Sequence, residues 1–216
     1  MAVVVGLRCK EGLVVCANRQ MSAPSASKSY ERRLTIERSQ SILFAYAGQP
    51  SLAREAREKI SEKIGQAQMP SSLLYLAADE VLADLRGRNV ELDLQVLIGI
   101  SAASEEPALF MFDGKALRVA DEFNFLGVGD SSLLRFLAAM KHSLELNIDE
   151  LASLAVDLLR KAEGYIEPSG GHIDIAIMKS GNQSCRLILE EDVQRIIRKL
   201  EEQGSVIHLS ARGASS

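Results

Sequence analysis

The spacing of apolar side chains divides the chain into blocks of strands and blocks of helices. Apolar residues at every second position from Leu92 to Ile100 predict a strand with one buried face, whereas apolar residues at every fourth position from Leu52 to Ile64 predict an amphipathic helix. The same criteria predict strands at about 2–7, 13–17, 34–38, 42–47, 92–100, 107–112, 115–120, 123–128, 173–178 and 185–189, and helices at about 51–64, 70–86, 131–144, 148–163 and 190–203.

Turn and capping residues fall between these segments. Asp113-Gly114 is a strong signal for a tight hairpin turn. Asn147, followed three residues later by Glu150, predicts a helix that begins with a capping box, and Gly87 and Gly164 are expected to end helices.

The order of the predicted elements is strands, two helices, strands, two helices, strands and a last helix. This order argues against βαβ winding and favours antiparallel sheets with helices packed outside, an α+β fold. At 216 residues one domain is expected, over 1–189, with a helix and polar tail at 190–216. An apolar stripe on that helix needs a covering surface, either on its own domain or on a neighbouring subunit, and the VIHLS stretch of the tail is long enough for one short strand.

Composition excludes several classes of function. The net charge is −4, with neither a basic excess nor a basic stripe, so nucleic-acid binding is not expected. No run of 18 apolar residues predicts a membrane span, and the first residues lack the basic segment of a secretory signal. We therefore expect a cytoplasmic protein, with no membrane partner and with its three cysteines reduced.

Five segments, in order, resemble the proteasome family. Residues 5–19 resemble its opening hairpin, and 27–36 resemble the segment that carries its Lys-Lys-apolar strand. Residues 44–48 resemble its Ala-Gly turn, 125–129 its Gly-x-Gly turn, and 169–174 the entry to its late strands. The resemblance implies a four-layer αββα sandwich, with two stacked antiparallel sheets between helix pairs, as in N-terminal nucleophile hydrolases. It also implies homo-oligomers in stacked rings and a possible ATPase or regulatory partner, with no cofactor and no metal.

Active members of that family are threonine peptidases, and their central positions can be carried over to this chain. The nucleophile falls on Ala2, which would be the first residue after removal of Met1, and Ala has an amine but no hydroxyl. The supporting aspartate falls on Asn18, an amide without charge. The lysine falls on Arg33, or on Arg32 if the register slips by one, while the glycine of the oxyanion turn is retained as Gly48.

Two further polar positions fall on Asp130 and on 165–167, and Ser169 is kept. The changes at the nucleophile, aspartate and lysine positions predict a ring-forming subunit that is catalytically silent, so assignment as an enzyme stays open. An alternative is a threonine-type peptidase in which Ala2 is an engineered replacement of the nucleophile. Hydrolysis of small amides on the same fold ranks last, because no residue to activate a water is evident.

The cysteines and histidines have simpler interpretations. Cys9, Cys16 and Cys185 lie in predicted strands, where a free thiol is usually a small buried apolar group. His142 is expected on a helix surface. His172 follows the segment that resembles the entry to the family's late strands, near the family's active-site cleft, and is expected to have a local structural role.

Overall fold

Within the part of the chain that the structure describes, ten strands and five helices follow in the predicted order. The structure is a computed structural model that describes residues 3–19, 32–37, 42–64, 70–88, 91–101, 105–127, 132–166, 172–181 and 185–213. The strands are β1 (Val4–Cys9), β2 (Gly12–Asn18), β3 (Leu34–Glu37), β4 (Ile42–Gly48), β5 (Leu94–Ile100), β6 (Ala108–Phe112), β7 (Leu117–Val119), β8 (Phe123–Leu126), β9 (Ile173–Lys179) and β10 (Cys185–Leu187). The helices are α1 (Pro50–Ile64), α2 (Ser71–Arg88), α3 (Ser132–Lys141), α4 (Ile148–Ile166) and α5 (Glu190–Gly213).

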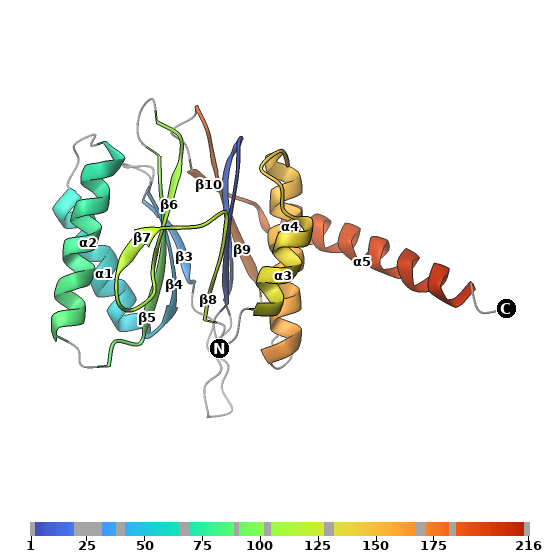
Figure 1. Ribbon diagram of the computed structural model, residues 1–216, viewed down its shortest axis with the longest axis horizontal. Coiled ribbons are helices and arrows are strands. Elements are labelled where there is room, and N and C mark those ends of the chain that lie inside the picture. The colour runs from blue at the N-terminus through green and yellow to red at the C-terminus, as the bar shows by residue number, and fades with distance from the viewer. Residues whose placement is uncertain are drawn as a thin grey trace.

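The strands form two antiparallel sheets stacked face to face. One sheet has the order β10-β9-β2-β1-β8 and the other β3-β4-β5-β6-β7. Helices α1 and α2 cover the outer face of the second sheet, while α3 and α4 cover the outer face of the first (Figure 1). The predicted αββα sandwich is therefore confirmed.

Apolar side chains fill three layers, one between the sheets and one beneath each helix pair. Strand β5 shows why its predicted one-sided burial is wrong. Val96 and Ile98 face α1 and α2, but Leu97 on the opposite face is also fully buried, because it packs between the two sheets. A strand in the middle of a sandwich is buried on both faces.

Three helices continue beyond the residues predicted to end them, and the first of these is α2, which runs past Gly87 to Arg88. Helix α4 runs past Gly164 to Ile166, and α5 continues through 204–213, where the sequence predicted a polar tail after a helix over 190–203. A single glycine costs a helix only about 1 kcal/mol. Extending an existing helix needs no new nucleus, so such a cost is readily absorbed.

Helix α5 packs on its own domain near its beginning. Val193 is buried, and Ile196, Ile197 and Leu200 are partly buried against the core beneath α3 and α4. The apolar stripe predicted from the sequence thus packs in part on the chain itself. The helix then leaves the α4 side and projects away from the body (Figure 1).

The predicted capping box at the start of α4 is confirmed. The Asn147 side-chain oxygen accepts hydrogen bonds from the N–H groups of Asp149 and Glu150, at 3.0 and 2.9 Å. The Glu150 carboxylate accepts one in return from the Asn147 N–H, at 3.0 Å. No helix among the described residues has the length and apolar character needed to cross a bilayer.

Candidate functional site

Asn18 ends β2 and holds the beginning of the chain. Its side chain is fully buried, and its Oδ1 accepts a hydrogen bond from the Val3 N–H at 3.0 Å. The Asn18 N–H donates to the Val3 carbonyl at 3.2 Å, which continues the pairing of β1 with β2. These two bonds fix the residue that directly follows Ala2.

Arg33 lies at the same end of the other sheet, directly before β3. Its carbonyl accepts a hydrogen bond from the Tyr46 N–H at 3.2 Å, and its guanidinium carbon lies 5.3 Å from the centre of the Tyr46 ring. The residue is only 4% exposed, so this cation is held inside the protein. A guanidinium at this distance from an aromatic ring gains cation–π attraction.

Gly48 ends β4, two residues after Tyr46. Its φ of +103° lies in the region that favours glycine, and a Cβ at this position would come within 2.3 Å of the Asp93 carbonyl oxygen. That oxygen accepts a hydrogen bond from the Gln49 N–H at 2.8 Å. The tight turn that leads into α1 therefore requires glycine.

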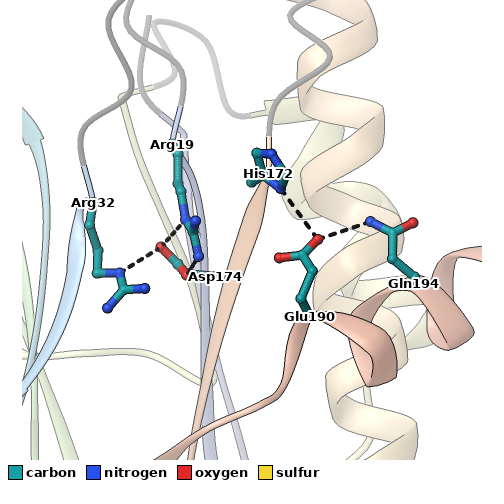
Figure 2. A network of polar contacts seen from close by, with 6 residues as sticks. All are labelled: Arg19, Arg32, His172, Asp174, Glu190 and Gln194. Atoms are coloured by element: carbon teal, nitrogen blue, oxygen red, sulfur yellow. Dashed lines mark hydrogen bonds and ion pairs between the residues drawn. The ribbon is translucent and has the colours of Figure 1, made fainter.

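An ion-pair network joins the two sheets at this end. Asp174 in β9 is 6% exposed and accepts two hydrogen bonds from the Arg19 guanidinium, with Nε to Oδ2 at 2.9 Å. Arg32, directly before Arg33, lies 3.6 Å from Oδ2 of the same carboxylate (Figure 2). The hydrogen bond with Asp174 raises the pKa of Arg19 above its usual value. Sequence analysis assigned this network no role.

A second polar group lies beside this network. His172 Nδ1 lies 3.4 Å from Oε1 of Glu190, and the same oxygen accepts a hydrogen bond from Gln194 at 3.0 Å (Figure 2). Hydrogen bonds from Gln194 and His172 lower the pKa of Glu190 despite some desolvation. His172 is exposed, and this contact links the start of β9 to the start of α5.

The structure describes three of the six predicted site residues. Asn18 lies at the end of one sheet, while Arg33 and Gly48 lie at the neighbouring end of the other. Ala2, Asp130 and Ser169 lie outside the described residues, as do the side chains of 165–167. Of the two arginines considered for the lysine position, Arg33 is the buried one, whereas the side chain of Arg32 is 53% exposed.

The strands that lead toward the undescribed site residues end at the same place. Leu126, at the end of β8, pairs with Val4, and Ile173, at the start of β9, pairs with Asn18. The chain therefore leaves this sheet at the end of β8 and enters it again at the start of β9, both beside the beginning of β1.

The described groups at this end offer charge and hydrogen bonds but no nucleophile. An asparagine amide has no carboxylate to share a proton, and arginine keeps its proton at all ordinary pH values. Burial raises the pKa of the Cys9 thiol and raises that of Cys185 to about 12, so these two thiols remain protonated at neutral pH. Among the described residues, no group of three or more His, Cys, Asp or Glu side chains could hold a metal ion.

His142 corrects another expectation. Its side chain is not on the surface but 2% exposed, and its Nε2 lies 2.6 Å from the Arg8 carbonyl oxygen. The ring also meets Phe123 edge-on. The residue ties the end of α3 to β1, far along the sheet from Asn18.

Comparison with known proteins agrees with this architecture. The sequence profile of the family described as Proteasome subunit matches residues 2–178. Proteasome subunit beta 1 of Ignicoccus hospitalis is 22% identical over 186 residues, covering 84% of this chain and 92% of that protein.

Solved structures show the same fold at low sequence identity. An Anbu (Gly-1) mutant from Hyphomicrobium sp. strain MC1 is 16% identical, with a TM-score of 0.80 over 100% of this chain and 98% of that one. Anbu from Pseudomonas aeruginosa, solved as a helical assembly, is 16% identical, with a TM-score of 0.71 over 97% and 96% of the two chains.

Proposed function

This chain belongs to the proteasome subunit family, and from that premise we propose that it is a self-assembling subunit that does not itself hydrolyse peptides. The proposal depends mainly on the burial and hydrogen bonding of the Asn18 side chain. A neutral amide is buried at the position where the family resemblance calls for a carboxylate, and it is hydrogen-bonded to Val3, one residue from Ala2.

The chemistry supports silence at three separate points. Ala2 supplies no hydroxyl or thiol to attack a peptide carbonyl. Asn18 supplies no negative charge to offset a buried cation, and Arg33 has a larger, planar head that stays protonated. Loss of any one group would slow acyl transfer, and here all three differ.

Assembly is supported by an exposed apolar face on α3. The side chains of Leu133, Phe136 and Met140 are 45%, 60% and 68% exposed, and their spacing places them on one side of the helix. Adjacent exposed apolar residues of this kind mark contact surfaces between proteins. A helical or ring-shaped homo-oligomer would cover these side chains. The helical assembly of Anbu from Pseudomonas aeruginosa is a precedent for such an oligomer with this fold.

Finer features of the proposal follow from the resemblance. We predict from the resemblance that the rings stack, that an ATPase or other regulatory partner binds them, and that the protein is cytoplasmic. We expect no cofactor. An assembly without nucleophiles would serve as a scaffold or gate.

The test combines native mass spectrometry with covalent labelling by an electrophilic peptide probe. We expect a multiple of the 23.5 kDa subunit and no label on the N-terminal residue. The variant Phe136→Glu should shift the mass toward smaller species, while Val119→Glu, an exposed apolar position on β7, is the matched control. A monomeric wild-type protein, or a labelled N-terminus, would contradict the proposal.

The second candidate is a threonine-type peptidase in which Ala2 replaces the nucleophile. It retains the Gly48 turn, which the resemblance assigns to the oxyanion donor and which the backbone requires in either case. Ala2→Thr distinguishes the two candidates. Labelling of this single variant supports the peptidase, whereas labelling only after Asn18→Asp and Arg33→Lys are added supports a natively silent subunit.

A further inference from the structure

A groove and a helix face, at opposite ends of the same sheet, complement each other in charge. The groove has a volume of about 700 Å³ and lies where β3 and β10 meet at the edges of their sheets. The α2 face is the outer side of the first turns of α2, around Leu73 and Leu76. We infer that the α2 face of one subunit docks into the β3–β10 groove of the next, so that subunits join head to tail. This inference rests on the proposed function, because it names a contact through which the subunit assembles with itself.

The β3–β10 groove combines cationic and apolar side chains. Among its described lining residues are three arginines, Arg32, Arg57 and Arg186, but only one carboxylate, that of Glu37. Three positive charges against one negative charge give the lining a net charge of +2. Leu189, at the end of the groove toward α5, is 65% exposed, so an apolar contact is open as well.

The ion pairs around the groove leave this positive excess in place. Glu37 lies 3.8 Å from Nε of Arg57 and is already included in the sum. Asp174 lies 3.6 Å from Nε of Arg32, but Arg19 binds both oxygens of that carboxylate. Including Arg19 and Asp174 together therefore adds one positive and one negative charge and does not change the balance.

The α2 face combines two exposed leucines with acidic side chains. Leu73 and Leu76 are 48% and 57% exposed and lie one helical turn apart. Asp79 and Glu80 follow one turn later on the same side of α2, and Glu80 forms an ion pair with Lys63 of α1. Adjacent exposed apolar side chains mark contact surfaces between proteins.

Two further glutamates extend the α2 face at the beginning of the helix. Glu105 accepts hydrogen bonds from the N–H and the hydroxyl of Ser71, the former at 3.2 Å, and Glu106 beside it is exposed. The face therefore has four acidic residues against one lysine, a net charge of −3. The segments 65–69 and 102–104, which precede α2 and Glu105 in the sequence, contain no charged residue.

The two surfaces lie at opposite ends of the sheet β3-β4-β5-β6-β7. Helix α2 packs against β6 and β7, and the Tyr75 hydroxyl donates a hydrogen bond to the Leu117 carbonyl of β7 at 3.0 Å (Figure 1). The groove borders β3, four strand spacings of about 4.8 Å away, or roughly 19 Å. The α2 face therefore cannot fill the groove of its own chain. A contact between two different surfaces repeats from subunit to subunit and generates a ring if it closes and a helix if it does not.

A second copy of the chain is the occupant that these observations favour. Each copy carries both an acidic apolar face and a basic apolar groove, and the exposed Leu73, Leu76 and Leu189 are uncovered in the single chain. Charge complementarity of this kind selects the partner and sets the register of the contact.

Native mass spectrometry of two full-length variants, alone and mixed, tests the contact. Leu76→Arg changes the α2 face and keeps the groove, whereas Arg186→Glu changes the groove and keeps the α2 face; both residues are exposed. Each variant alone should associate at least about tenfold more weakly than the wild type and lose the largest assembly, because like charges then oppose each other. Arg195→Glu, an exposed arginine of α5 outside both surfaces, is the matched control and should keep the wild-type mass.

The mixture identifies the pairing. Equal amounts of the two variants should form species larger than either forms alone, with both chains in equal numbers, because the intact α2 face of one fits the intact groove of the other. Wild-type assembly in both single variants would overturn the inference, and so would a mixture without such species, which would assign the two surfaces to other partners. Either result leaves self-assembly standing, whereas a monomeric wild type would contradict the proposed function itself.

Discussion

Replacing Gly48 by alanine tests whether the turn between β4 and α1 depends on its unusual backbone. Two costs can be worked from the structure. An alanine with a φ of +103° carries backbone strain of roughly 1–3 kcal/mol. Its Cβ would also lie 2.3 Å from the Asp93 carbonyl oxygen, so that carbonyl must move and its 2.8 Å hydrogen bond from Gln49 weakens, at about 0.5–1.5 kcal/mol. Together we expect a loss of about 2–4 kcal/mol.

Two other glycines separate these costs. Gly181 has a φ of +72° but, among the described residues, no atom within 4 Å of an added Cβ, so Gly181→Ala should show the strain alone, about 1 kcal/mol. Gly87 lies in α2 with an ordinary helical backbone and open space around it. Gly87→Ala should therefore stabilise the protein by about 0.5–1 kcal/mol.

The assay is urea unfolding followed by circular dichroism, at one protein concentration because assembly contributes to stability. For a chain of this size, a loss of 2–4 kcal/mol corresponds to a fall in Tm of roughly 5–15 °C. The expected order of stability is Gly87→Ala, wild type, Gly181→Ala and Gly48→Ala. A Gly48→Ala variant within 0.5 kcal/mol of the wild type would refute the reasoning about the turn.

Three further predictions concern other parts of the fold. Arg19→Ala should lower the free energy of unfolding by about 2–4 kcal/mol, because it removes the main partner of the buried Asp174. A double-mutant cycle with Asp174→Ala, measured by urea unfolding, should give a coupling energy of about 1–3 kcal/mol, and additive effects would contradict this. Asn147→Ala should lower the free energy of unfolding by about 1 kcal/mol, because it removes the N-cap of α4. An unchanged Tm in thermal unfolding would show that the cap contributes nothing to stability. Burial raises the pKa of Cys185 from 9.0 to about 12, so the unfolded thiol ionises first and stability should fall by about 1.4 kcal/mol per pH unit as the pH rises above 9. Comparison of Cys185→Ala with the wild type at pH 8 and pH 10.5 isolates this loss.

Local chemistry explains why much of the fold could be predicted. The capping box at Asn147 and the Asp113-Gly114 turn depend only on neighbouring residues, and both occur as expected: Asp113 Oδ1 accepts hydrogen bonds from the N–H groups of Lys115 and Ala116. The second buried face of β5 could not be read from its alternation, because it depends on a sheet formed by residues far away in the chain. The continuation of α5 also exceeded what its composition indicated.

The site shows the same division. The family resemblance pointed to Asn18, Arg33 and Gly48, and the structure places them at neighbouring sheet ends, although their catalytic assignment remains a prediction. The Arg19–Asp174–Arg32 network was missed because both arginines lie more than 140 positions from Asp174 in the sequence. One signal was present: Asp174 is a lone charge within the apolar run of β9, which usually means that a buried partner exists.

The order of strands within the two sheets determines when each sheet can form while the chain is being synthesised. The sheet that carries Arg33 and Gly48 is built from β3 to β7, one continuous stretch, and can pair as soon as that stretch leaves the ribosome. The sheet that carries Asn18 needs β9 and β10 from the far end of the chain. At about 5–20 residues per second, the first hairpin waits roughly 10–30 s for its partner strand. Asp174 therefore joins Val3, Asn18 and Arg19 only after most of the chain has been synthesised, so this end of the site forms only in a nearly complete sandwich.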